Sequence, residues 1–179
     1  MSDTAISAEG ALPAFRVFGV ESDSIVDGPG LRLAIFTQGC PHRCPGCHNP
    51  HSHDPAGGRE MTVGEILDTI KKNPLLSGIT LTGGEPLEQA AACLALVRAL
   101  PPGLNVWLYS GYTYEEIAQS GDPDRLALLG ACDVLVDGRF VLAERSLELR
   151  FRGSRNQRLI DLKKTAVAGQ VVLWEVPVW

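Results

Sequence analysis

The stretch "LRLAIFTQGCPHRCPGCHNP", residues 31–50, joins a largely apolar run directly to a loop that holds three cysteines. The first seven residues, 31–37, are rich in aliphatic and β-forming side chains, which predicts a strand buried inside a sheet. Pro45 and Gly46 lie between the second and third cysteines and disfavour a helix there. The expected strand therefore ends at a cluster of potential metal ligands. The rest of the chain has to supply the neighbouring strands and helices that bury this strand.

Helix-like and strand-like segments alternate along the remainder of the chain. Residues 61–73 predict an amphipathic helix, with Thr62 as its N-cap, Glu65 three positions on and Pro74 at its end. Further strands are expected at residues 78–82, 105–110 and 133–136, and further helices at 88–100 and 115–119. This alternation predicts an α/β fold with a mostly parallel sheet and helices packed outside it.

Unusual short motifs follow the ends of the expected strands. They are the cysteine loop, "GGEP" at 83–86, "YSGY" at 109–112 and "DGR" at 137–139. Because the carboxyl ends of parallel strands meet at one edge of a sheet, where ligands bind in such folds, we expect these four segments to converge on one site.

Length, composition and charge limit the class of protein. A chain of 179 residues predicts one domain over residues 13–179, preceded by a flexible tail over residues 1–12. The net charge of −5 does not favour nucleic acid as a partner. No apolar run is long enough to span a membrane, and the first residues lack the pattern of a secretion signal, so we expect a cytoplasmic protein without membrane contact.

A reducing compartment makes clustered cysteines more typical of metal binding than of disulfides. Cys40, Cys44 and Cys47 have the spacing C-x3-C-x2-C, which can fill three corners of a cuboidal iron–sulfur cluster and leave the fourth iron open. Cys93 and Cys132 lie in apolar segments, and we expect both to be core residues.

The same loop also allows a zinc site of the Cys3His type, and from its spacing alone the choice stays open. Four histidines are candidates for the fourth ligand: His42, His48, His51 and His53. A thioredoxin-like redox pair is the least supported alternative, because it needs only two cysteines at the start of a helix.

The motif "LTGGEP", residues 81–86, decides between these alternatives. Gly83 and Gly84 follow a strand and lack side chains that would keep a ligand from the backbone, and Glu85 offers a carboxylate to a ligand ammonium group. Together with an open three-cysteine loop, this motif resembles the radical S-adenosylmethionine enzymes.

The resemblance covers most of the chain. Residues 24–50, "SIVDGPGLRLAIFTQGCPHRCPGCHNP", resemble the activating enzymes of glycyl-radical proteins. The later segments "ITLTGGEPL", "CDVLVDGRF" and "RFRGSRNQRLIDL" look most like the activating proteins of anaerobic ribonucleoside-triphosphate reductases. The fold implied by this resemblance is a partial, laterally open (β/α) barrel of the radical S-adenosylmethionine type.

The resemblance also implies the chemistry. The three cysteines of such proteins hold a [4Fe–4S] cluster, whose fourth iron binds the amino and carboxylate groups of S-adenosylmethionine. Reductive cleavage gives a 5′-deoxyadenosyl radical, which removes hydrogen from a glycine of the partner enzyme. The implied partners are an anaerobic ribonucleoside-triphosphate reductase as protein substrate and flavodoxin or ferredoxin as electron donor.

Individual residues take roles from the same resemblance. Those expected to contact S-adenosylmethionine are Gly46, Cys47 and His48 at the adenine, Gly83, Gly84, Glu85 and Pro86 at the methionine end, and Asp137 at the ribose, the amino-acid part or a cation. Arg32 alternates with apolar neighbours in the first expected strand, so its side chain should be buried. A buried charge needs a counter-ion, for which a carboxylate of the site is the candidate. The roles of Asp27 and of residues 156–158 stay undecided.

Two other functions remain as alternatives. The first alternative is that the chain activates a different glycyl-radical enzyme, such as pyruvate formate-lyase, since "CHNP" after the cluster loop is also typical of the activating enzymes of such proteins. The second is an interaction module that binds zinc or an iron–sulfur cluster without catalysis.

Overall fold

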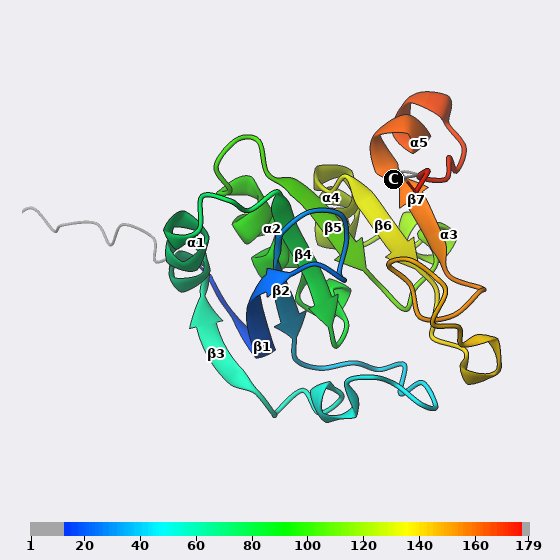
Figure 1. Cartoon of the computed structure of the whole chain (residues 1–179), viewed down its shortest axis with the longest axis horizontal. Coiled ribbons are helices and arrows are strands. Elements are labelled where there is room, and N and C mark those ends of the chain that lie inside the picture. The colour runs from blue at the N-terminus through cyan, green and yellow to red at the C-terminus, as the bar shows by residue number, and fades with distance from the viewer. Residues whose placement is uncertain (1–12, 177–179) are drawn as a thin grey trace, which may run out of the picture.

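A computed structural model describes residues 13–176, which form an open seven-stranded sheet (Figure 1). The strands are β1 (Ala14–Ser24), β2 (Arg32–Thr37), β3 (Arg59–Thr62), β4 (Gly78–Gly83), β5 (Asn105–Tyr109), β6 (Val134–Asp137) and β7 (Arg158–Asp161). Their order is β3-β1-β2-β4-β5-β6-β7, and the central four, β2-β4-β5-β6, are parallel to one another. The expected α/β class, with a mostly parallel and laterally open sheet, is confirmed.

Both edges of the sheet are antiparallel. β1 runs antiparallel to β2 and β3, and β7 runs antiparallel to β6. The sequence patterns predicted the four central strands but not β1, β3 or β7, because these antiparallel strands lack the continuous apolar run of a strand buried on both faces. The tail expected over residues 1–12 lies outside the described residues.

Residues 13–176 contain five α-helices, of which the first four connect strands and the last follows β7. They are α1 (Val63–Lys72), α2 (Ala90–Arg98), α3 (Tyr114–Ala118), α4 (Pro123–Ala131) and α5 (Leu162–Ala168). The predicted capping box is present in α1: Thr62 Oγ1 accepts from the Glu65 amide at 3.2 Å, and the Glu65 carboxylate accepts from the Thr62 amide at 2.7 Å. Among the described residues, no helix is long and apolar enough to cross a membrane.

The helix predicted at residues 88–100 begins later than expected. A short 3-10 helix, Pro86–Gln89, precedes α2, and the Glu85 side chain caps it by accepting from the Leu87 amide at 3.1 Å. The proline of "GGEP" thus starts a tight turn, which carries the chain from β4 into α2 directly beside the cysteine loop.

The helices α1, α2 and α4 cover one face of the sheet. Ile66, Leu96 and Leu128 from these helices form one apolar core with alternate residues of the strands, among them Leu81 and Leu108. Cys93 and Cys132 are buried in the same core, as predicted. Burial raises the pKa of the Cys93 thiol to about 12, so this sulfur is a packing atom and not a thiolate.

The other face carries a smaller cluster around Trp107. The Trp107 ring meets Phe151 and Trp174 edge-on, with ring centroids 5.4 and 5.0 Å away. Val134, Val136 and Leu159 complete the cluster. This face has no helical layer of its own among the described residues, and a loop from residues 139–157 and the C-terminal segment cover part of it.

Arg32 is fully buried, as predicted, but the expected carboxylate counter-ion is wrong. Its guanidinium donates to Thr80 Oγ1 at 2.7 Å, to Asn105 Oδ1 at 2.6 Å and to backbone carbonyls, and it lies over the Trp107 ring. Desolvation by burial lowers its pKa to about 10. Neutral oxygens and an aromatic face can replace a carboxylate because guanidinium is weakly hydrated and offers five donors.

Candidate iron–sulfur and S-adenosylmethionine site

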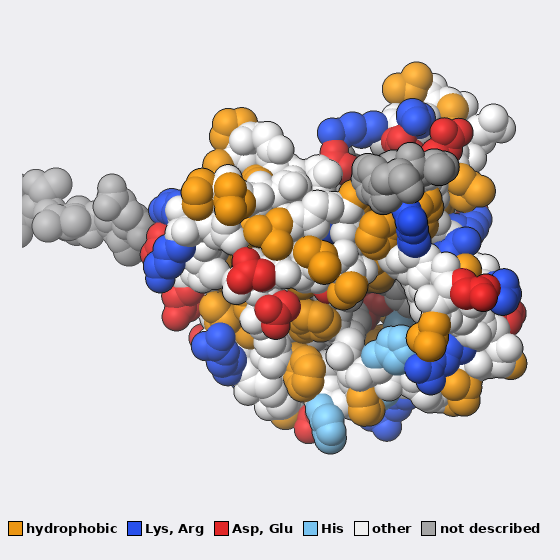
Figure 2. Space-filling model, viewed as in Figure 1, with side chains coloured by type: hydrophobic (Ala, Val, Ile, Leu, Met, Phe, Trp, Pro, Cys, Tyr) orange, Lys and Arg blue, Asp and Glu red, His pale blue; other side chains and the backbone are white. Residues whose placement is uncertain are grey.

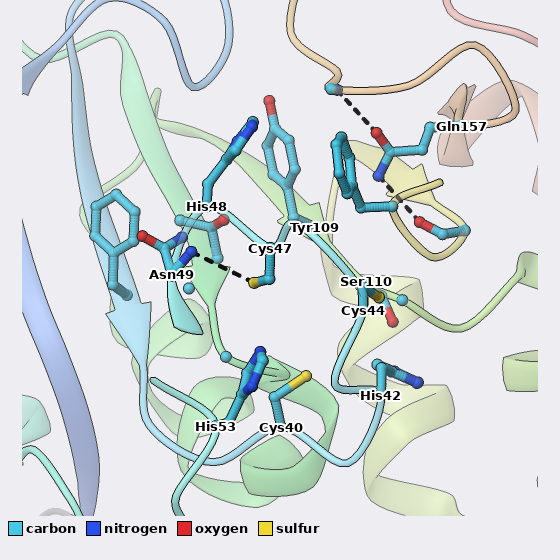
Figure 3. Close-up of a pocket in the computed structure, with 18 of the residues that line it drawn as sticks. Cys40, His42, Cys44, Cys47, His48, Asn49, His53, Tyr109, Ser110 and Gln157 are labelled. Atoms are coloured by element: carbon cyan, nitrogen blue, oxygen red, sulfur yellow. Dashed lines mark hydrogen bonds between the residues drawn. The ribbon is translucent and has the colours of Figure 1, made fainter. Parts of the chain in front are cut away.

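The carboxyl ends of β2, β4, β5 and β6 open onto a cavity of about 210 Å³ (Figure 3). All four predicted segments contribute to it: the cysteine loop, Gly83 and Gly84, the segment after β5, and Gly138. The expected convergence on one sheet edge is therefore confirmed. Figure 2 shows a hollow on this surface with a histidine side chain beside it.

Cys40, Cys44 and Cys47 all line the cavity and are free thiols, each partly exposed. Left-handed backbone at Arg43 (φ +48°) and Gly46 (φ +75°) bends the loop around the cavity. A turn from the Cys47 amide to the Cys44 carbonyl (3.1 Å) holds the second and third cysteines together. The Asn49 amide donates to Cys47 Sγ at 3.4 Å.

Burial raises the pKa of the Cys40 thiol, although the backbone amides of His42 and Arg43 act in the opposite direction. Within residues 13–176, no three Cys, His, Asp or Glu side chains converge closely enough to hold a single metal ion. The three thiols surround a space rather than meeting at a point. That arrangement fits a cuboidal iron–sulfur cluster bound through three corners.

Gly83 and Gly84 line the cavity, and close contacts with neighbouring backbone explain why both positions are glycine. A Cβ on Gly83 would come within 2.5 Å of Phe36 Cα, and Gly83 has φ +92°. A Cβ on Gly84 would come within 2.5 Å of the Gly39 carbonyl oxygen. The amide of Gly84 donates to the Thr37 carbonyl at 2.8 Å. The two glycines therefore let "GGEP" lie directly against the strand end that starts the cysteine loop.

The Glu85 carboxylate is completely buried and does not line the cavity. It accepts from Ser110 Oγ at 3.0 Å and from the Gly111 amide at 2.8 Å, and it contacts His42 Nε2 at 2.9 Å. With the Leu87 amide as a further donor, its acceptor positions face protein groups. Glu85 thus ties the cysteine loop to the segment that follows β5, and its predicted contact with a ligand ammonium group stays a prediction.

His42 is the partner of Glu85 inside the cysteine loop. Arg139 Nε donates to His42 Nδ1 at 3.2 Å, which leaves the proton on Nε2, facing Glu85. The His42 ring also meets the Tyr112 ring edge-on at 4.5 Å, and it fills the space where a Cβ on Gly111 would lie. His42, one of the zinc candidates, therefore anchors the loop between Cys40 and Cys44.

The segment 156–158, whose role the sequence left undecided, closes the loop 139–157 onto the strand end of β6. Gln157 Oε1 accepts from the amides of Gly153 and Ser154 at 2.8 and 3.1 Å, and Gln157 Nε2 donates to the Gly138 carbonyl at 3.0 Å. Asn156 Nδ2 donates to the Arg139 carbonyl at 2.9 Å. These contacts form one wall of the cavity, which Gln157 itself lines.

Asp137 is buried beside this wall but lines a neighbouring hollow and not the main cavity. Its carboxylate pairs with the Arg158 guanidinium and accepts from the Tyr114 amide at 2.8 Å. Arg158 also pairs with Glu115 at 2.7 Å. The acidic group at the end of β6 is therefore engaged in holding β7 and α3 in place.

Comparison with known proteins places these features in a family. A domain family described as "4Fe-4S single cluster domain" matches residues 26–160. The chain is 36% identical over 146 residues to the anaerobic ribonucleoside-triphosphate reductase-activating protein of Vibrio cholerae, covering 74% of this chain and 89% of that protein. The protein of the same description from phage T4 is 36% identical over 144 residues, covering 75% and 86%. That of Escherichia coli K12 is 35% identical over 151 residues, covering 78% and 94%.

The chain belongs to the family of anaerobic ribonucleoside-triphosphate reductase-activating proteins. The resemblance to radical S-adenosylmethionine activating enzymes drawn from the sequence is thereby confirmed. The match of residues 26–160 spans all three cysteines, "GGEP" and the wall formed by residues 138–157.

The predicted site residues of this family member fall into two groups. Those that line the cavity are Cys40, Cys44, Cys47, His48, Gly83 and Gly84. Those that support it from behind or beside are Gly46, Glu85, Pro86 and Asp137, of which Gly46 has left-handed backbone (φ +75°) that favours glycine. The ligand and cosubstrate roles given to all ten stay predictions.

The structure adds cavity residues that sequence reasoning missed, among them Phe36, Asn49, Thr82 and Phe140. The Phe140 ring lies 5.2 Å from the His48 ring, so the two form an aromatic wall. Phe36 and Thr82 belong to strands that were predicted, and their place at the carboxyl end of each strand was a usable signal. Phe140 and Gln157 gave no such signal, because a long loop brings them to the site.

Proposed function

We propose that the chain is the activating enzyme of an anaerobic ribonucleoside-triphosphate reductase, on which it generates a glycyl radical. The observation that carries this proposal is the open three-thiol cavity beside "GGEP" at the end of a parallel sheet, in a chain whose relatives bear that activity in their names. When bound at the three cysteines, a [4Fe–4S] cluster supplies the electron that cleaves S-adenosylmethionine to methionine and a 5′-deoxyadenosyl radical.

Cys40, Cys44 and Cys47 are the proposed cluster ligands. They come from one short loop without a fourth cysteine nearby, since Cys93 and Cys132 are buried in the helical core. The open corner is then available to the amino and carboxylate groups of S-adenosylmethionine.

The walls of the cavity suit the remaining parts of this cosubstrate. Gly83 and Gly84 present backbone at the methionine end without side chains in the way. The His48 and Phe140 rings offer an apolar and aromatic surface at the expected place of the adenine. Glu85 acts behind them, by fixing Ser110, Gly111 and the cysteine loop in one arrangement.

Two parts of the proposal concern partners. The substrate is a glycine of the reductase, which has to reach the cavity from its open side. The electron comes from a one-electron carrier such as flavodoxin or ferredoxin, and this donor stays a prediction.

The test is to incubate the reconstituted, reduced protein and S-adenosylmethionine with an anaerobic ribonucleoside-triphosphate reductase or with pyruvate formate-lyase. Electron paramagnetic resonance should detect a glycyl radical on the reductase and none on pyruvate formate-lyase. A protein carrying Cys44→Ala is the control, and it should give no radical on either target. A radical found only on pyruvate formate-lyase would contradict the proposed target and support the alternative one.

A further inference from the structure

His53 lies in the wall of the cavity and has no role in the proposed function described above. Cys40 and His53 are the two residues shared by the main cavity and a neighbouring hollow of about 480 Å³. Figure 3 shows the imidazole of His53 beside the thiol of Cys40, both reaching from the loop toward the space that Cys47 also faces. The ring therefore lies next to one of the proposed cluster ligands.

The backbone around His53 holds this ring in place. The Cys40 amide donates to the His53 carbonyl at 3.1 Å, and the Gly39 amide donates to the Ser52 carbonyl at 2.8 Å. Ser52 is fully buried, and its hydroxyl donates to the Asn49 carbonyl at 2.7 Å. The segment 49–53 is thus tied to the start of the cysteine loop from two sides.

The His53 ring has one buried polar atom without a partner. Nε2 is shielded from solvent and makes no hydrogen bond to any other protein group. Leaving a buried polar group unpaired is unfavourable, so buried ring nitrogens normally have a partner. An acceptor held in the adjoining cavity would supply the missing one.

We propose that His53 donates its Nε2 hydrogen to a sulfur atom of the cluster bound at Cys40, Cys44 and Cys47, and so raises the reduction potential of that cluster. Hydrogen bonds to cluster or ligand sulfurs stabilise the more negative, reduced state. His53 is thus a positioning and tuning residue for the electron-accepting group. The inference rests on the proposed function, since it requires a cluster at the three cysteines.

Two other contacts for Nε2 are less favoured by the geometry. Direct ligation of iron by His53 would fill the corner that S-adenosylmethionine has to occupy in the proposed function. Contact with S-adenosylmethionine is less favoured because the ring lies beside Cys40, at the border with the neighbouring hollow.

The experiment is a potentiometric titration of the reconstituted cluster in the absence of S-adenosylmethionine. In His53→Phe the ring shape is kept and the donor is lost, so at a fixed solution potential the ratio of reduced to oxidised cluster should fall about tenfold, or about 59 mV for one electron. His53→Gln retains an N–H donor and should recover part of this shift. His51→Phe, an exposed residue on the same short segment, is the matched control and should leave the ratio unchanged.

The outcomes separate this inference from the proposed function. If the wild-type protein assembles no iron–sulfur cluster, the proposed function fails. If wild type and His53→Phe carry equal iron and sulfide and have the same potential, only the role of His53 is refuted, and an isolated loss of S-adenosylmethionine affinity would refute it as well.

A second measurement covers the case in which His53→Phe loses the cluster. Wild-type protein and His53→Gln, both labelled with ¹⁵N-histidine, are compared by pulsed electron paramagnetic resonance in the reduced state. A weak nitrogen coupling that disappears in His53→Gln supports a hydrogen bond. A strong coupling typical of ligated nitrogen, or no difference between the two proteins, would overturn it.

Discussion

The helix-covered face of the sheet and its carboxyl edge are built by different means. The face is packed with aliphatic side chains such as Ile66, Leu81 and Leu128, which are fully buried. The edge is held by polar contacts, with Glu85 bound by His42, Ser110 and Gly111. Apolar packing tolerates exchange of one aliphatic for another, whereas a buried polar network needs every partner. The face should therefore govern stability, and the edge should govern whether the cofactor is held.

The largest expected effect separates cysteines of the two regions. Cys44→Ala should abolish cluster assembly, seen as the loss of the brown colour and of iron and sulfide after anaerobic reconstitution. Without the cluster, this variant and the wild-type protein should unfold at almost the same temperature. Cys93→Ala should keep the cluster and lower the unfolding temperature, because its sulfur is packed in the core. A Cys44→Ala protein that still binds the full cluster would contradict the ligand assignment.

The next largest effect is expected from a substitution that creates a cavity in the core under the helix-covered face. Ile66→Ala should lower the free energy of unfolding by about 2–5 kcal/mol, measured by urea denaturation, since the side chain is completely buried between α1 and the sheet. Below the unfolding transition, iron content should stay the same. An equal fall in iron content in the folded protein would show that face and edge are not independent.

Glu85 links the two regions, so its substitution should affect both readouts. Glu85→Gln removes the charge and places an amide among donors, which should cost about 1–3 kcal/mol of unfolding free energy and speed the loss of iron to a chelator. Glu88→Gln, on the same short helix but partly exposed and paired with Arg125, is the control, with at most about 1 kcal/mol expected. Identical behaviour of the two variants would contradict the linking role of Glu85.

The smallest effect belongs to a helix end far from the cavity. Thr62→Ala removes the N-cap of α1 and should lower the unfolding free energy by about 1 kcal/mol. S-adenosylmethionine cleavage by the folded, reconstituted protein should be unchanged. A loss of cleavage much larger than the loss of stability would show coupling between α1 and the site.

The sequence predicts these two regions to different extents. Periodic apolar residues located the four central strands and α1, because burial on one face imposes a pattern that can be read directly. The antiparallel strands β1, β3 and β7 lack that pattern, so they were missed. Cys40, Cys44, Cys47 and the glycines were found from spacing and from their place after predicted strands.

What could not be predicted from sequence depends on contacts between distant segments. Only the fold shows that Ser110 and Gly111 come close enough to bind Glu85. The carboxylate expected beside Arg32 is replaced by neutral acceptors such as Thr80 and Asn105, which are far apart in the chain. Such pairings are set by the register of neighbouring strands, and no local pattern encodes them.

The most direct test of the account is metal analysis combined with a cleavage assay on the anaerobically reconstituted protein. The account predicts about four iron and four sulfide ions per chain and, after reduction in the presence of S-adenosylmethionine, the release of 5′-deoxyadenosine and methionine. A colourless protein that holds one tightly bound zinc ion and releases no 5′-deoxyadenosine would contradict it.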